Sequence, residues 1–199
     1  MSFWDQQYAV NGFKYGMEPN AFLRSEAGRL ASGARILMPG DGEGRNSVWL
    51  ATQGHRVLAV DASSVGLQKA QKLAAERGVT IETVLADLAD WEPEAGRFDA
   101  VVLTFVHLPL HLRPLAHRRL AQALKPGGLL LLEAFHPKQL GCNSGGPKQV
   151  EMLYTPADLR SDFNGLLAEE SAAECEVTLD EGPGHQGAAW VTRYIGRMA

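Results

Sequence analysis

Three glycines alternate with polar residues directly after a short apolar run, and this pattern constrains the fold more than any other part of the 199-residue chain. The segment is Ile36-Leu37-Met38-Pro39-Gly40-Asp41-Gly42-Glu43-Gly44-Arg45-Asn46. A strand that breaks into such a loop and then opens a helix lets backbone N–H groups approach a polar ligand with no side chain between them. The pattern therefore predicts a strand, loop and helix that cradle a nucleotide-type ligand.

Asp61 follows the next apolar run, residues 57–60. If that run is the neighbouring buried strand, its carboxyl end brings an acid to the same edge as the glycine loop, where a carboxylate accepts hydrogen bonds from both hydroxyls of a ribose. The two features together indicate an adenosine derivative. Asp61 could instead cap the helix that follows, and the two roles are compatible.

Length and charge restrict the class of protein. The length suits a single domain over 1–199. The formal net charge of −4 does not favour binding to nucleic acid or to an anionic membrane. The two cysteines, Cys142 and Cys175, are too few for a disulfide framework and too far apart for a metal knuckle, so we expect no metal site and a reduced, cytoplasmic setting. We find no membrane-spanning run, no export signal and no signal for an oligomeric state.

Strands and helices alternate from residue 34 to residue 135. We expect strands over 34–38, 56–60, 80–85, 98–105 and 129–135, and helices over 45–53, 63–77 and 114–124. This alternation predicts an α/β fold in which a doubly wound, mostly parallel sheet has helices on both faces. Residues 34–135 would then form the core that binds the adenosine-type cofactor.

The two ends of the chain depart from this rhythm. Residues 1–18 are aromatic and punctuated by glycine, and we expect them to cover the sheet, either by packing alone or as a lid. A helix is expected to begin at Pro19 and to stop at Gly33. Residues 136–199 would lie on the substrate side, with a glycine-rich loop and a short helix over 156–163. The two runs 170–180 and 188–197 predict a closing hairpin. With these two strands the sheet would have seven strands, and its C-terminal strand would be antiparallel.

A glycine-rich first turn also occurs in nicotinamide-dependent reductases. In that fingerprint the third glycine comes one residue later, where this chain has Arg45. The length also leaves little room for a second nucleotide half and a substrate domain. A reductase is therefore the less favoured alternative, whereas a non-catalytic sensor of an adenosine cofactor would keep the same cradle.

Several of these motifs together resemble class I S-adenosylmethionine-dependent methyltransferases: the glycine loop, Asp61, Asp87 after the third strand, and Leu124-Lys125-Pro126-Gly127-Gly128 before the fifth. More narrowly, Tyr15-Gly16-x-x-Pro19-Asn20 and Gly44-Arg45-Asn46-Ser47 resemble small bacterial methyltransferases related to tellurite-resistance and thiopurine-type enzymes. The resemblance implies S-adenosylmethionine as cofactor. It also implies methyl transfer to a small-molecule nucleophile, such as a thiol or a metalloid oxyanion.

The resemblance also implies roles for individual residues. Gly40, Gly42 and Gly44 would line the methionine end of the cofactor, and Asp61 would hold the ribose hydroxyls. The remaining expected cofactor contacts are Asp87 and Leu88 at the adenine edge, Phe105 and Val106 beside the transferable methyl, and Asp41, Arg45, Asn46, Ala62 and Tyr15. Asp87 could instead be a turn residue, and Arg45 and Asn46 could merely begin a helix.

One position departs from the family pattern. Many members carry an acid just before the glycines, where this chain has Met38. That acid helps to hold the amino group of the cofactor, so Asp41, Glu43 or backbone carbonyls must replace it. Asp41 and Glu43 are our candidates.

Two histidines are the candidate catalytic residues. His107 follows the fourth strand, and His185 lies in the turn of the expected hairpin. Because the carboxyl ends of parallel strands form the ligand crevice, we expect both to border the substrate cavity. An oxygen or nitrogen nucleophile would need such a base, whereas a thiolate or a metalloid would not.

Overall fold

The computed structural model describes residues 2–199 and contains one mixed sheet with helices on both faces. The strands are Arg35–Pro39 (β1), Arg56–Asp61 (β2), Glu82–Leu85 (β3), Phe98–Thr104 (β4), Leu124–Phe135 (β5), Leu167–Asp180 (β6) and Gln186–Met198 (β7). The α-helices are Phe3–Tyr8 (α1), Ala21–Glu26 (α2), Arg45–Thr52 (α3), Ser64–Glu76 (α4), Arg113–Gln122 (α5) and Pro156–Phe163 (α6). Short 3₁₀ turns span Ala27–Arg29, Pro137–Gly141 and Val150–Met152.

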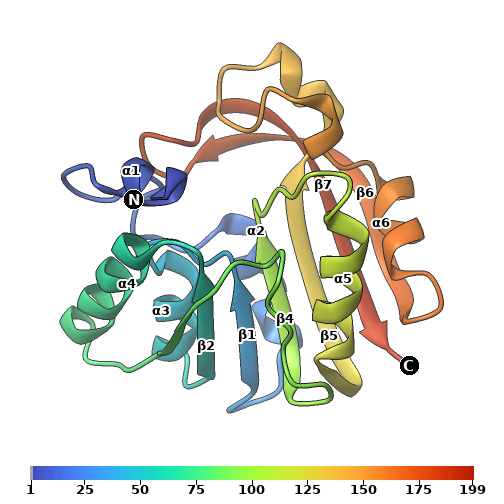
Figure 1. The fold of residues 1–199 in the computed structure, drawn as a ribbon, viewed down its shortest axis with the longest axis horizontal. Coiled ribbons are helices and arrows are strands. Elements are labelled where there is room, and N and C mark those ends of the chain that lie inside the picture. The colour runs from blue at the N-terminus through green and yellow to red at the C-terminus, as the bar shows by residue number, and fades with distance from the viewer. Residues whose placement is uncertain (1) are drawn as a thin grey trace.

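The strand order is β3-β2-β1-β4-β5-β7-β6, as Figure 1 shows for the labelled strands. Strands β1 to β5 are parallel, β7 runs antiparallel to β5, and β6 pairs antiparallel with β7. The predicted doubly wound, seven-stranded sheet is therefore confirmed. The order reverses between β1 and β4, and this switch point places a crevice at the carboxyl ends of these strands.

Successive side chains of the central strands pack on opposite faces of the sheet. Met38 belongs to an apolar cluster that includes Leu50 of α3. Its neighbour Leu37 belongs to a different cluster, which includes Leu120 of α5. Because both faces are covered, the middle of each central strand is apolar, and this is why the sequence shows continuous apolar runs there.

Several element boundaries differ from the expectation, and the largest differences are at α2 and β5. Asn20 caps α2 by accepting a hydrogen bond from the Leu23 amide at 2.9 Å, so Pro19 lies outside the helix, which ends at Glu26 rather than running to Gly33. Strand β5 begins at Leu124, which pairs with Phe98, and not at residue 129. A local side-chain cap sets the start of α2, whereas the pairing of Leu124 with Phe98 is a tertiary contact that local spacing does not encode.

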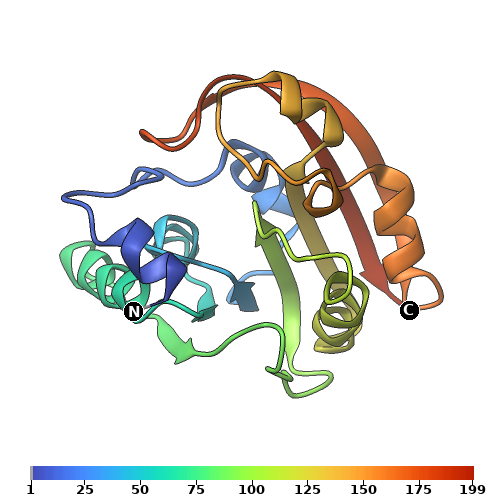
Figure 2. The ribbon, with the colours of Figure 1, turned by 45° about the horizontal axis from the view of Figure 1, so that its top comes forward.

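The N-terminal segment and the β6–β7 hairpin form a roof over the carboxyl ends of the strands, visible in Figures 1 and 2. Helix α1 was not expected as a helix, and a capping box between Ser2 and Asp5 begins it. The Gly184 amide at the hairpin tip donates to the Lys14 carbonyl at 2.9 Å. Within residues 2–199, no helix is both long enough and apolar enough to cross a membrane.

Candidate cofactor and acceptor site

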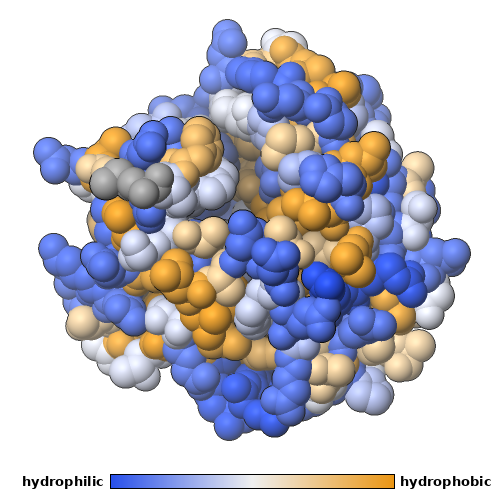
Figure 3. Space-filling view, viewed as in Figure 1, coloured by the Kyte–Doolittle hydropathy of each residue, from blue (hydrophilic) through white to orange (hydrophobic). Residues whose placement is uncertain are grey.

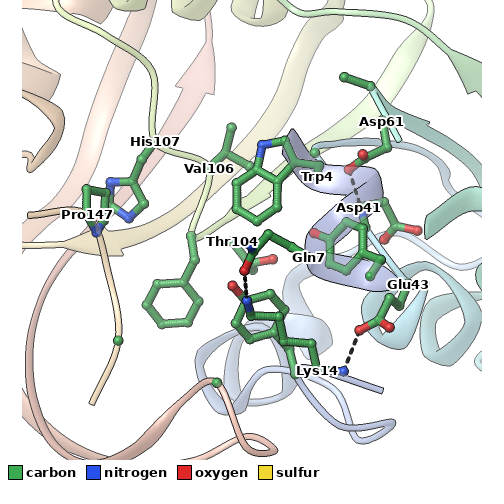
Figure 4. Close-up of a pocket in the computed structure, with 18 of the residues that line it drawn as sticks. Trp4, Gln7, Lys14, Asp41, Glu43, Asp61, Thr104, Val106, His107 and Pro147 are labelled. Carbon is green, nitrogen blue, oxygen red and sulfur yellow. Dashed lines mark hydrogen bonds between the residues drawn. The ribbon is translucent and has the colours of Figure 1, made fainter. Parts of the chain in front are cut away.

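A cavity of about 760 Å³ lies beneath this roof, and Figure 3 shows its mouth as a hollow in the surface. The glycine loop, the ends of β2, β3 and β4, the segment around α1, the loop after β5 and the hairpin turn all contribute to its lining. In Figure 4 the acids Asp41, Glu43 and Asp61 gather on one side, and His107 and Pro147 lie on the other. The cavity therefore has an acidic half at the glycine loop and a second half beyond β4.

The glycines of the loop have separate structural tasks. A β-carbon on Gly42, where φ is +64°, would lie 2.6 Å from the Tyr8 hydroxyl, so glycine allows α1 to close onto the loop. A β-carbon on Gly44, where φ is +89°, would lie 2.6 Å from the backbone of Ala70 in α4. Gly40 and Gly42 line the cavity, but Gly44 does not. Gly44 lets α3 and α4 pack closely, and its contact with the ligand remains a prediction.

Asp61 ends β2 with both carboxylate oxygens held by the backbone. Oδ2 accepts from the Gly42 amide and Oδ1 from the Ser63 amide, each at 2.8 Å. Burial raises the pKa of Asp61, and these two hydrogen bonds oppose the rise. Helix α4 is capped by the Ser63 side chain, which accepts from Gly66, so the capping role belongs to Ser63. Asp61 keeps further lone pairs for a ligand, and Ala62 lines the cavity beside it.

Asp41 and Glu43, the two candidate acids, differ in what surrounds them. The Glu43 carboxylate accepts from the Lys14 amide at 2.7 Å and from the Lys69 ammonium at 2.8 Å, so it ties the N-terminal segment to α4. Asp41 accepts only from Ser47, through its hydroxyl at 2.5 Å and its amide at 3.3 Å. Burial, together with nearby Asp61, raises the pKa of Asp41 to about 7. A buried acid with no cationic partner in contact favours Asp41 as the group that binds an ammonium.

Arg45 and Asn46 begin α3, and their side chains differ in how fully they are used. Both ends of the Asn46 amide are occupied, because Oδ1 accepts from the Asn20 amide and Nδ2 donates to the Thr104 hydroxyl, each at 2.8 Å. Asn46 also lines the cavity and keeps one N–H and one lone pair, so its scaffolding role is compatible with the predicted cofactor contact. Arg45 donates through Nη2 to Glu181 at 2.7 Å, while its buried Nη1 has no partner among the described residues. Arg45 lines the cavity, so Nη1 is available to an anionic group there.

The ends of β3 and β4 supply the predicted residues at the adenine edge and near the methyl group. Asp87 and Leu88 line the cavity after β3, and the Asp87 carboxylate accepts from the Ala89 amide at 2.9 Å, so its turn role coexists with its position in the site. Phe105 and Val106 line the cavity after β4. Phe105 has a φ of +55°, a strained value for a non-glycine residue that is typical of functional sites.

Aromatic side chains of the N-terminal segment cover the glycine loop. Trp4 and Tyr8 stack with ring centroids 5.6 Å apart, and Tyr15 meets Tyr8 edge-on at 6.4 Å. The Asp5 carboxylate accepts from the Ser63 hydroxyl at 2.7 Å, which fastens α1 to the start of α4. The segment therefore roofs the cavity where the cofactor is expected, and whether it opens remains a prediction.

The two candidate histidines both line the cavity, but they differ in how their ring nitrogens are bonded. His107 contacts the Met152 carbonyl through Nδ1 at 2.7 Å and accepts from the Phe135 amide through Nε2 at 3.3 Å. Burial lowers the pKa of His107 to about 4. With both nitrogens engaged, His107 is a neutral wall residue, and the structure does not support a role as base. The His185 ring instead lies against Tyr15 and Phe105, with both ring-centroid distances 4.4 Å.

Some residues of the site were not singled out from the sequence. Phe135 ends β5 and lines the cavity, as the strand-end argument used for Asp61 would have suggested. Glu181 lies in the hairpin turn four residues before His185 and is buried, a pairing that only the folded turn reveals. Within residues 2–199, no cluster of histidine, cysteine or acidic side chains is arranged to hold a metal ion.

Parts of the chain are similar in sequence to known methyltransferases. Residues 36–128 match a family described as a methyltransferase domain. A 2-heptyl-1-hydroxyquinolin-4(1H)-one methyltransferase of Mycobacteroides abscessus is 30% identical over 118 residues, which are 58% of this chain and 52% of that protein. A thiopurine S-methyltransferase of Pseudomonas entomophila is 41% identical over 66 residues, 31% of this chain and 30% of that protein. The chain thus spans about half the length of the first relative and about a third of the second.

A solved structure extends the likeness to the whole fold. The N-methyltransferase NodS from Bradyrhizobium japonicum, in complex with S-adenosyl-L-homocysteine, superposes with a TM-score of 0.71 at 15% identity, covering 98% of this chain and 96% of that one. The chain therefore has the fold of this N-methyltransferase, and residues 36–128 within it match the methyltransferase-domain family. These matches agree with the resemblance stated from the motifs, including the similarity to thiopurine-type enzymes.

The acidic half of the cavity offers groups at three points that suit S-adenosylmethionine, the cofactor that the motifs imply. Arg45 offers a buried, unpartnered guanidinium nitrogen that suits the methionine carboxylate. Asp41 offers a carboxylate that suits the amino group, in place of the acid missing at Met38. Asp61 offers two oxygens to the ribose hydroxyls. All three side chains line the same cavity.

The raised pKa of Asp41 predicts a pH dependence of cofactor binding. Only ionised Asp41 attracts the ammonium, so affinity for S-adenosylhomocysteine should rise as pH passes upward through about 7. Calorimetric titrations between about pH 6 and pH 8 should show the rise in the wild type and little of it in Asp41→Asn. An equal rise in the variant would assign the titration to another group. Asp90→Asn, an exposed acid beyond β3, is the control.

Proposed function

We propose that the protein transfers a methyl group from S-adenosylmethionine to the hydroxyl or thiol of a small heteroaromatic molecule. In this proposal, residues 34–135 hold the cofactor and residues 136–199 contribute most of the acceptor side. The observation that supports this proposal most strongly is that the cavity continues past Phe105 into a second half, which is lined by Phe135, Met152 and His185. A sensor that binds the cofactor without catalysis has no need for this second half.

The chemistry of the second half supports a neutral, planar acceptor. Phe105 and Phe135 lie with ring centroids 4.6 Å apart, and His185 meets Phe135 edge-on at 5.3 Å. Beyond Thr104, the described residues that line the cavity include no Asp, Glu, Lys or Arg. Aromatic walls favour a flat ring. The two relatives are named for a hydroxyquinolone and a thiopurine as substrates, and both of these compounds are heteroaromatic.

When bound, S-adenosylmethionine would supply an electrophilic methyl group on a sulfonium that is its own leaving group. The protein then has to orient the acceptor and exclude water. Alignment of this kind accounts for about 7–11 kcal/mol of the barrier in well-oriented reactions. Phe105 and Val106 would place the acceptor ring against the methyl group, while Trp4 and Tyr8 would close the cofactor side to solvent.

An acceptor panel tests this function. The purified protein with S-adenosylmethionine should methylate heteroaromatic thiols and hydroxyquinolones, detected by mass spectrometry, and should leave tellurite unchanged. Binding of S-adenosylhomocysteine with no methylation across aromatic, aliphatic and oxyanion acceptors would favour the sensor. Thermal stabilisation by a nicotinamide dinucleotide alone would overturn the cofactor assignment.

A further inference from the structure

Glu181 is held at one fixed position beneath the His185 ring. Its Oε1 accepts from the Asn20 side chain at 3.0 Å and from the Ala21 amide at 3.2 Å, both at the start of α2. Its Oε2 accepts from Arg45 of α3 at 2.7 Å. Two helices therefore fix a buried carboxylate at the hairpin turn.

The hairpin turn places His185 against this carboxylate. The Glu181 amide donates to the His185 carbonyl at 2.9 Å, which closes the turn and keeps the two residues together. Nδ1 of His185 lies 3.7 Å from Oε2, is buried and has no hydrogen-bond partner among the described residues. This separation is an electrostatic contact, slightly too long for a hydrogen bond, and it orients the Nδ1 side of the ring toward a negative charge.

Three aromatic rings limit how His185 can rotate. Tyr15 and Phe105 lie on it at 4.4 Å, and Phe135 at 5.3 Å. With Nδ1 directed at Glu181, the Nε2 edge is left for the cavity, which His185 lines. This is the reverse of His107, whose two nitrogens are both engaged by the backbone.

We propose that Glu181 is a positioning residue that keeps the His185 proton on Nδ1, so that Nε2 acts as the base for a hydroxyl or thiol acceptor. The proposal rests on the proposed methyl transfer for its acceptor. A carboxylate behind an imidazole selects one tautomer and stabilises the cation that forms when the ring takes a second proton.

The proton and the electrons of this step balance within the site. Nε2 takes the proton of the acceptor O–H or S–H, and the lone pair left on that atom forms the new bond to the methyl carbon. The electron pair of the broken carbon–sulfur bond stays on the cofactor sulfur, which becomes a neutral thioether. His185 then holds a positive charge facing Glu181 and releases the proton to water after the product leaves.

The charges around His185 are consistent with a base that is neutral at rest. Burial, opposed by Glu181, lowers the pKa of His185. Burial also tends to raise the pKa of Glu181, but the neighbouring His185 and Arg45 outweigh it and bring the value to about 2. The other titratable or charged groups around the ring are Arg45 on α3, Lys14 and Tyr15 after α1, and His107 after β4.

Histidine titration by NMR tests the pair without cofactor or acceptor. We expect Glu181→Gln to lower the pKa of His185 by about one unit or more, because an opposite charge this close has an effect of that size. The His185 signal is assigned by its loss in His185→Gln. In the wild type, nitrogen chemical shifts should show the proton on Nδ1, a readout that does not depend on how any variant folds. An unchanged titration, or a proton on Nε2, would overturn the proposal.

Turnover with two matched acceptors tests the chemistry. For a heteroaromatic hydroxyl that is protonated at neutral pH, we expect His185→Gln and Glu181→Gln to lower kcat by about 100-fold or more. For a heteroaromatic thiol that is already ionised, the loss should be less than about threefold, since no proton has to be removed. Equal losses on both acceptors would reduce the pair to a packing role.

Two controls separate failure of this inference from failure of the proposed function. Glu176→Gln, an exposed acid on β6, should change neither the His185 titration nor turnover. S-adenosylhomocysteine binding by calorimetry should persist in His185→Gln. A wild type that binds this ligand but methylates neither acceptor would overturn the proposed acceptor class, while the NMR result would still decide whether Glu181 controls His185.

Discussion

Asp61→Ala is expected to weaken S-adenosylhomocysteine binding by about 100-fold or more. Each ribose hydroxyl would lose a charged acceptor, which is worth about 1.5–3 kcal/mol, and about 1.4 kcal/mol corresponds to a factor of ten in affinity. The Gly42 amide also loses its acceptor at 2.8 Å, so the glycine loop should become less well ordered. Calorimetric titration measures the affinity, and thermal unfolding of the cofactor-free protein measures the effect on the fold.

The contrast between these two measurements decides the role of Asp61. Helix α4 keeps its cap in the variant, because the Ser63 side chain supplies it. A large fall in unfolding temperature with unchanged affinity would therefore assign Asp61 to loop structure alone. Asp90→Ala, which removes an exposed acid beyond the neighbouring strand, should alter neither quantity.

Removal of residues 1–16 is expected to leave a folded core with cofactor affinity at least about tenfold lower and turnover almost abolished. The segment contributes the Tyr8 ring over Gly42 and the Lys14 amide that binds Glu43 at 2.7 Å. As a lid, it would also close the site to water, as transfer of a methyl group requires. Circular dichroism checks the fold, and calorimetry and turnover check the site.

Point variants refine the test of the lid. Tyr8→Ala removes the ring above the glycine loop and leaves the rest of the segment in place, so it should reproduce much of the loss in affinity. Val10→Ala changes a residue of the same segment that is 49% exposed, and should have no effect. Normal turnover in the truncated chain would show that residues 1–16 only pack on the sheet.

The local sequence pattern was enough to predict the strands and helices that form the glycine-loop half of the cavity. Gly40, Gly42 and Asp61 were placed correctly at the cavity because each follows an apolar run, and the ends of parallel strands meet at one edge. The same rule carried Asp87, Leu88, Phe105 and Val106 to the cavity. Strand periodicity and turn residues are short-range signals, so the sequence alone was sufficient for this part of the fold.

The roles of neighbouring loop residues could not be separated in the same way. Gly42 and Gly44 belong to the same glycine loop, and their sequence context does not separate their roles. In the structure Gly44 packs on Ala70 of α4 and is not part of the cavity lining. Asn46 and Arg45 are adjacent, yet the Asn46 amide bonds to Asn20 and Thr104, whereas Arg45 bonds to Glu181. Which partners surround a side chain depends on elements that are distant along the chain.

The histidines show most clearly what was left to the tertiary structure. The sequence indicated that His107 and His185 both border the cavity, and both do. Only the folded chain shows that backbone groups occupy the two nitrogens of His107, whereas Glu181 lies behind Nδ1 of His185. Sequence periodicity determined the strands and the edge where the site forms, because those depend on neighbours within a few residues. The choice of base depends on hydrogen bonds and charges from α2, α3 and the hairpin, which come together only when the chain has folded.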